Sequence, residues 1–171
     1  MLDKIRKKLK ETKGLNTIEV AICSMIILVA IGGLLDLNGI MKKFNATSST
    51  TSYIARTISK QGGVRMNKPS SFSGEYVTSQ SLYSDVKSNL NNAGIKDSEF
   101  TVKINGYTLS SSSNVPIVTY GDDLKVELTI NYSWKLLSQF TGGNNYSKTS
   151  NRIVTSSIKN RTSSNIGSVV Q

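Results

Sequence analysis

The sequence of 171 residues contains no histidine, two prolines and a single cysteine, Cys23. Structural zinc sites are built largely from Cys and His, and a Cys nucleophile needs an adjacent base such as His. The sequence therefore excludes a zinc site, a Cys–His nucleophilic centre and an intramolecular disulfide. Cys23 itself lies in an apolar run after Ile22, where a lipid-modification motif would place a small residue, so we interpret it as a small hydrophobic side chain.

Acidic residues are also scarce, with 11 against 21 basic ones and a formal net charge of +10. Six of the basic residues precede Gly14, namely Lys4, Arg6, Lys7, Lys8, Lys10 and Lys13. A basic flank before an apolar run is typical of the cytoplasmic side of a membrane helix. High positive charge can also indicate nucleic-acid binding. We do not expect a nucleic-acid partner, because the other Lys and Arg residues are scattered along the chain.

No Gly-rich phosphate loop and no convergent acid–base pair is present. Asp122 and Asp123 are adjacent on an expected turn, a geometry that does not make a catalytic dyad, and no third acid converges on them to hold a metal. We therefore expect no enzymatic activity, no cofactor and no metal site.

One long apolar run dominates the chain. As an α-helix, the segment from Leu15 to Leu35 would be about 31 Å long, which matches a hydrocarbon core of about 30 Å. A helix satisfies its own backbone hydrogen bonds in lipid. The sequence therefore predicts a basic leader over residues 1–14 and a transmembrane helix over residues 15–36. Gly32-Gly33 is expected to loosen this helix locally, and Asp36 to mark the far interface.

Three fates are open for this segment. It can be a plain signal anchor, or a secretory signal peptide cut after Ala30-Ile31-Gly32, which has the small-x-small form of such a site. It can also be cut after Gly14, with the apolar helix retained. The position of Glu19, five residues after Gly14 at the start of the apolar run, favours this third fate. An ordinary signal peptide gains nothing from a carboxylate there.

The run Gly14-Leu15-Asn16-Thr17-Ile18-Glu19-Val20 resembles the class III signal of type IV pilins and pseudopilins. With Ile26-Ile27-Leu28-Val29-Ala30, Leu34-Leu35-Asp36 and a polar continuation that contains Ala46, Ala55 and Arg56, residues 8–62 are most similar to minor pseudopilins of the tight-adherence (TadE-like) type. One departure is Leu15, where typical type IV pilins carry Phe.

This resemblance implies that prepilin peptidase cuts between Gly14 and Leu15 and that Glu19 guides assembly. The chain would be a minor pseudopilin of a tight-adherence-like pilus, conjugation or secretion apparatus, with other pilin subunits and an assembly platform as partners. It would be a single-pass plasma (inner) membrane protein with a cytoplasmic N-terminus and an extracytoplasmic head, and could enter an extracellular pilus. The alternative is a membrane-anchored or secreted cell-surface binding domain with an ordinary signal segment.

A physical argument for Glu19 does not need the family. A charged group at a membrane boundary is costly and is usually paired or functional. Cleavage after Gly14 would free an α-amine on Leu15, one helical turn from Glu19. Near a helix N-terminus the carboxylate is also favoured by the macrodipole. Glu19 could then pair with the Leu15 amine of a neighbouring subunit and set the register. The alternative is a Glu19 that is simply solvated among lipid headgroups.

For the rest of the chain we predict an α+β fold, in which the transmembrane helix continues into a polar helix that packs on a small antiparallel sheet with one short helix. Residues 37–62 form the polar extension, with apolar side chains at helical spacing at both ends and a Thr-lined middle. The run 45–52 is poor in helix formers, so a flexible Ser/Thr tether is the alternative. Gly62-Gly63 ends the element.

Residues 63–171 are expected to form the head. Leu82, Val86 and Leu90 mark the short amphipathic helix. Strands are predicted at 100–105, 115–120, 124–134 and 146–158, with a turn at Asn105-Gly106. In the third of these strands, apolar and polar residues alternate almost without exception. One of its faces is therefore expected to be buried, against residues 37–60.

Overall fold

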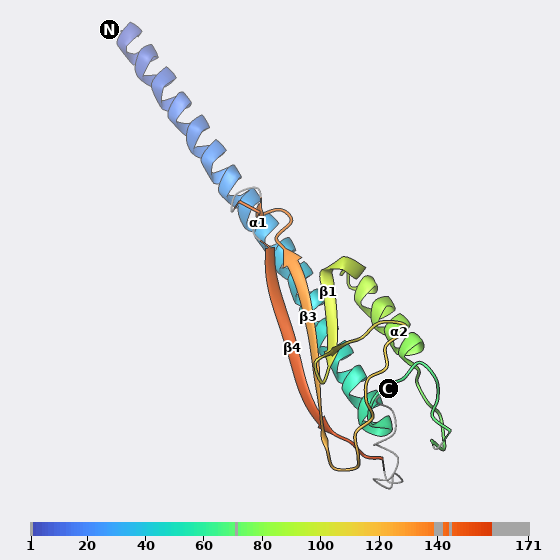
Figure 1. Ribbon diagram of the computed structural model, residues 1–171. Coiled ribbons are helices and arrows are strands. Elements are labelled where there is room, and N and C mark those ends of the chain that lie inside the picture. The colour runs from blue at the N-terminus through green and yellow to red at the C-terminus, as the bar shows by residue number, and fades with distance from the viewer. Residues whose placement is uncertain (1, 71, 139–141, 144, 159–171) are drawn as a thin grey trace. The chain divides into compact units, whose positions relative to one another are not determined.

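The computed structural model describes residues 2–70, 72–138, 142–143 and 145–158, with side chains from Thr17 onward. Figure 1 shows its helices and strands. The chain divides into two compact units. The first consists of Met1–Ile40 and Trp134–Asn144, and the second of Met41–Ser133 and Asn145–Gln171. The fold is α+β, as predicted, and each unit is described by itself below.

Helix α1 (Leu2–Gln61) contains the predicted transmembrane helix and its polar extension. It runs through Gly32 and Gly33 without a break, and the expected local loosening at these glycines stays a prediction. The helix ends at Gly62, which has a φ of +72° and whose N–H donates to Ile58 O over 2.6 Å. A left-handed residue after the last turn is the common way to end a helix, and Gly adopts it without strain.

The Ser/Thr-rich run of α1 is helical, so the flexible tether is not what the chain forms here. Thr47 Oγ1 donates to Lys43 O and Thr51 Oγ1 to Thr47 O, each over 2.7 Å. Such bonds to the preceding turn do little to stabilise a helix. Burial does more: Thr47, Thr50 and Thr51 are all buried. Tertiary packing therefore overrides the poor intrinsic propensity of this run.

Helix α2 (Ser79–Asn92) is the predicted short helix. Thr78 caps its N-terminus by accepting a hydrogen bond from Ser81 N–H through its side chain, over 3.3 Å. Leu82, Val86 and Leu90 are fully buried, as their spacing predicted. A short 3₁₀ turn, η1 (Asp97–Glu99), leads from α2 towards the sheet.

The sheet is antiparallel and has four strands in the order β2-β1-β3-β4. Their bounds are β1 (Phe100–Ile104), β2 (Tyr107–Thr108), β3 (Asp123–Ser133) and β4 (Asn145–Thr155). Asn105 at the β1–β2 turn has a φ of +50°, which fits the predicted Asn-Gly turn. Strand β3 is central and pairs along its whole length with β4.

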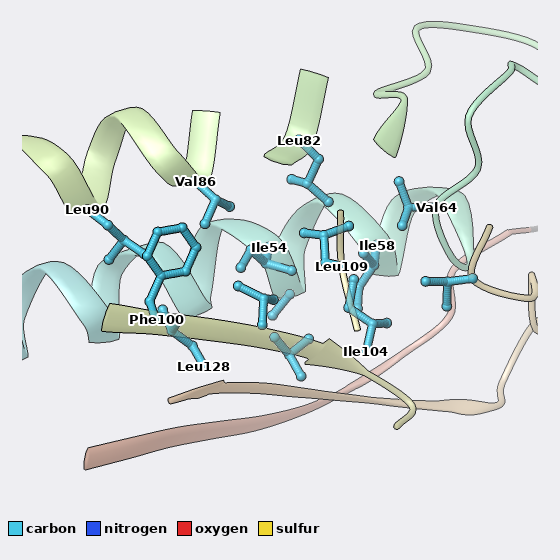
Figure 2. Close-up of a cluster of buried hydrophobic side chains, with 14 of the residues drawn as sticks. Ile54, Ile58, Val64, Leu82, Val86, Leu90, Phe100, Ile104, Leu109 and Leu128 are labelled. Carbon is cyan, nitrogen blue, oxygen red and sulfur yellow. The ribbon is translucent and has the colours of Figure 1, made fainter. Parts of the chain in front are cut away.

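The hydrophobic core lies on one face of this sheet. Alternate residues of β1 and β3 are buried and the residues between them are more exposed. The buried side chains form one cluster with Ile54 and Ile58 of α1 and with the apolar face of α2. Figure 2 shows these side chains meeting between the two helices and the strands. Both helices therefore cover the same sheet face, as predicted for residues 37–60.

The predicted strand over residues 115–120 is wrong. The structure assigns no strand there, although Val115 N–H donates to Val64 O and Val118 N–H to Gly62 O, each over 2.8 Å. Pro116 has no N–H to donate. The segment thus makes isolated hydrogen bonds to the irregular chain that follows α1, rather than a ladder with a strand.

Candidate functional site

Between positions 18 and 35, α1 has a nearly continuous apolar surface. Ten large hydrophobic side chains between positions 18 and 35 are half or more exposed, namely Ile18, Val20, Ile22, Met25, Ile26, Ile27, Leu28, Ile31, Leu34 and Leu35. A helix that is apolar on all sides is normally covered by lipid or by other helices. By length and composition α1 is able to cross a membrane. The chain is therefore compatible with a single-pass membrane protein.

The sequence-predicted site residues lie at the beginning of this apolar surface. Glu19 is an exposed residue of α1. Among the residues that the structure describes, Glu19 takes part in none of the ion pairs. The backbone of Gly14 and Leu15 belongs to α1, and the side chain of Leu15 lies outside the described residues. The structure thus locates Glu19 within reach of other molecules, and its predicted role stays a prediction.

A feature that the sequence did not reveal lies at the other end of the apolar surface. There the Asp36 carboxylate accepts two backbone hydrogen bonds through Oδ2, from Leu136 N–H over 2.7 Å and from Leu137 N–H over 2.9 Å. Leu136 and Leu137 belong to the loop between β3 and β4. Asp36 is buried although it follows Leu34 and Leu35, both strongly exposed. It fastens the loop to α1 where the apolar run ends.

Gly32 and Gly33 give the same loop room to approach α1. A Cβ atom on Gly32 would lie 3.7 Å from Leu136 Cβ, and one on Gly33 would lie 3.6 Å from Leu137 Cδ1. These are ordinary contact distances, so a larger side chain at either position would meet a leucine. A Cβ alone would fit at both positions, whereas a side chain longer than that of Ala would collide with the loop. The sequence signal was Leu136-Leu137 themselves, an apolar pair just beyond the alternation of β3.

Within the second unit, α1 is also fixed by polar contacts on two sides. Tyr53 Oη donates to Asp85 Oδ2 of α2 over 2.7 Å. Ser59 Oγ donates to the backbone carbonyl of Thr155 in β4 over 2.6 Å. Along α1, the two hydrogen-bonding residues lie on either side of the stretch that contains the buried Ile54 and Ile58. The polar half of α1 is thus an integral part of the head and not a linker to it.

Asp122 and Asp123 have structural roles in the described part of the chain. Asp122 Oδ2 accepts hydrogen bonds from Thr119 N–H, over 3.1 Å, and from Thr119 Oγ1. Asp123 begins β3. Within the described residues no three Asp, Glu, Cys or His side chains are grouped so that they could hold a metal ion.

No protein-family model, curated protein or solved structure matches the chain. The features of the chain that bear on its function are the basic leader, Gly14, Glu19, the exposed apolar part of α1 and the continuation of α1 into the core of the head.

Proposed function

We propose that the protein is a pilin-like subunit, most similar to a minor pseudopilin of the tight-adherence type, that acts by assembly and not by catalysis. One observation carries the proposal: a single helix begins with a basic segment, passes Glu19 and an exposed apolar surface, and ends within the core of an α+β head. A separate anchor joined by a tether would not need this continuity.

In the proposed pathway, prepilin peptidase removes residues 1–14 at the cytoplasmic face and the mature chain keeps its apolar helix. Subunits associate through these helices, whose exposed apolar side chains exchange lipid for one another. The Leu15 α-amine and the Glu19 carboxylate of neighbouring subunits neutralise each other. The pairing stabilises the assembly because an unpaired charge among apolar helices costs several kcal/mol. A charged side chain at the centre of a bilayer has a free-energy cost of about this size. Partners are therefore the peptidase, other pilin subunits and the assembly platform.

The first test is the N-terminus of the mature protein, determined by mass spectrometry of the chain purified from membranes. A mature chain that begins at Leu15 supports the proposal. A chain that begins at Gly33 would instead be a secreted domain released by signal peptidase, and an intact Met1 would mean a plain membrane anchor. Either of these two results overturns the proposal.

The second test concerns Glu19. We expect Glu19→Ala to insert into the membrane like the wild type but to be absent from sheared surface fibres, because the Leu15 amine loses its counter-charge. Glu19→Asp keeps the charge and should assemble at least partly. Membrane fractionation and immunoblotting of the sheared fraction measure both steps. Normal assembly of Glu19→Ala would remove the role assigned to Glu19.

A further inference from the structure

The loop after β3 has an unusual composition for a turn at the end of a strand. Its residues 134–138 are Trp134-Lys135-Leu136-Leu137-Ser138. Leu136 is 46% exposed although it is apolar, and Lys135 is exposed. Within the loop, Ser138 Oγ donates to Lys135 O over 2.9 Å. A short segment thus combines Trp, Lys and an exposed Leu.

The attachment points on α1 locate this loop along the helix. Leu136 and Leu137 lie within 4 Å of the places where a Cβ on Gly32 and on Gly33 would be. These glycines precede Asp36 by four and three residues, and therefore by about 5–6 Å along the helix axis. The two leucines thus lie beside the last turn of the apolar run. In Figure 1 this segment follows β3 and runs against α1. If residues 15–36 cross a bilayer, the loop lies at its outer boundary.

The hydrogen bonds to Asp36 fit that boundary. An irregular backbone cannot face hydrocarbon, because its N–H groups would be unsatisfied. A carboxylate at the edge of the hydrocarbon is costly as well. Both costs are reduced here, because the Asp36 carboxylate accepts hydrogen bonds from the N–H groups of Leu136 and Leu137. Trp is also enriched at the membrane–water interface, and Lys extends its charge to the headgroups.

We propose that residues 134–138 form a membrane-docking loop, whose partner is the interfacial layer of the bilayer crossed by α1. Leu136 and Trp134 enter this layer, Lys135 contacts the phosphate groups, and Asp36 with Gly32 and Gly33 holds the loop at the required depth. The inference rests on the membrane placement of α1 in the proposed function, but it does not require cleavage after Gly14 or assembly through Glu19.

The native protein carries its own probe, because Trp134 is the only tryptophan of the chain. The full-length protein is reconstituted, at no more than one chain per vesicle, in phosphatidylethanolamine–phosphatidylglycerol vesicles that contain lipids with a nitroxide near the headgroup or near the bilayer centre. We expect blue-shifted emission that is quenched strongly by the headgroup-proximal nitroxide, less by the deep one, and weakly by acrylamide. Strong quenching by acrylamide without quenching by either nitroxide lipid would overturn the proposal.

Substitutions on α1 test whether the helix holds the loop. Gly32→Leu and Gly33→Leu place a side chain where Leu136 and Leu137 lie, and we expect both to lose most of the lipid quenching. Gly39→Leu is the matched control, because a Cβ at Gly39 meets nothing within 4 Å, and it should behave as the wild type. Equal quenching of Trp134 in Gly32→Leu, Gly33→Leu and Gly39→Leu would show that α1 does not position the loop.

The carboxylate is tested in the same assay with Asp36→Asn. This change weakens the acceptor for the Leu136 and Leu137 N–H groups, so we expect reduced lipid quenching and a red shift of the emission. Asp123→Asn, which removes the same charge at the start of β3, should leave the emission unchanged. A wild-type emission spectrum in Asp36→Asn would contradict the role assigned to Asp36.

The outcomes separate this inference from the proposed function. Extraction of the protein from vesicles by alkaline carbonate would refute the membrane placement of α1, and both proposals would fall. A protein that resists extraction, but whose Trp134 is reached by acrylamide alone, refutes only the docking loop. Trp134 that is shielded from acrylamide and from both nitroxide lipids would indicate a protein contact instead of lipid, and would also refute it.

Discussion

Because the polar half of α1 contributes to the core of the head, we expect two isoleucine substitutions, one in α1 and one in β4, to differ greatly in their effect on stability. Ile58 of α1 is completely buried, within the cluster that joins α1, α2 and the sheet, whereas Ile153 of β4 is 67% exposed. Truncation of a buried Ile to Ala costs about 2–5 kcal/mol, since it removes apolar contact and leaves a cavity. Truncation of an exposed one changes stability by no more than about 0.5 kcal/mol. Ile58→Ala should therefore destabilise the head and Ile153→Ala should not.

Hydrogen exchange of the β3 amides, followed by mass spectrometry on the full-length protein in detergent, measures this difference. Exchange of core amides reports the free energy of opening. A loss of 2–5 kcal/mol corresponds to exchange that is faster by about 30-fold to about 4,000-fold. Ile153→Ala should stay within about 2-fold of the wild type. Equal exchange in the two variants would mean that α1 does not belong to the core of the head, and the argument from its continuity would fail.

Two further substitutions probe how α1 is held in the head. Tyr53→Phe removes the hydrogen bond to Asp85 and should lower the free energy of unfolding by about 0.5–1.5 kcal/mol, measured by urea denaturation. Burial, and then the bond to Asp85, raise the pKa of Tyr53 from 10.0 to about 12. The unfolded chain therefore ionises first, and the wild type should lose stability as the pH rises from 10 towards 12, a loss that Tyr53→Phe should reduce. Gly62→Ala would strain a φ of +72° and place a Cβ 2.5 Å from Ile158 Cδ1. It should lower the midpoint of thermal unfolding more than Gly121→Ala, whose Cβ would meet nothing within 4 Å despite a φ of +91°.

The sequence predicted the parts of the fold that have a period. Strand β3 alternates Leu124, Val126, Leu128 and Ile130 with polar residues, and these four side chains are fully buried. The spacing of the apolar residues in α2 located its buried face equally well. In both cases one face is covered and the other is more exposed, so a single element carries enough information.

Strand β4 shows how this signal weakens at an edge. Its residues are mostly exposed, and only Ser150 and Val154 are partly buried. A polar strand was expected there, and it forms because its backbone pairs with β3 along eleven positions, not because its side chains alternate. The contacts of Asp36 were out of reach for a related reason. They join residues about 100 positions apart, and no local pattern records such a pair.

In the candidate site, too, some residues could be predicted from the sequence and others could not. Gly14, Leu15 and Glu19 were singled out from their spacing and from the resemblance to class III signals, and their predicted roles depend on a peptidase and a neighbouring subunit. Asp36 was read only as the end of the apolar run. Its partners, Leu136 and Leu137, lie in a loop about 100 positions later in the chain, and the apolar pair by itself does not indicate which residue it contacts.

The Ser/Thr run of α1 explains why one helix can have two such different halves. In the apolar half, hydrophobic side chains on all sides favour an apolar environment, and a helix is suited to it because it satisfies its own backbone hydrogen bonds. In the polar half, Thr47, Thr50 and Thr51 are buried, yet they are small. Thr47 and Thr51 also satisfy their hydroxyl groups within the helix, by donating to Lys43 O and Thr47 O. A low intrinsic helix propensity is tolerated in this run because tertiary packing stabilises the helix there. What keeps it helical is the core of the head, formed by Ile54 and Ile58 with strands that come 40 or more residues later in the chain.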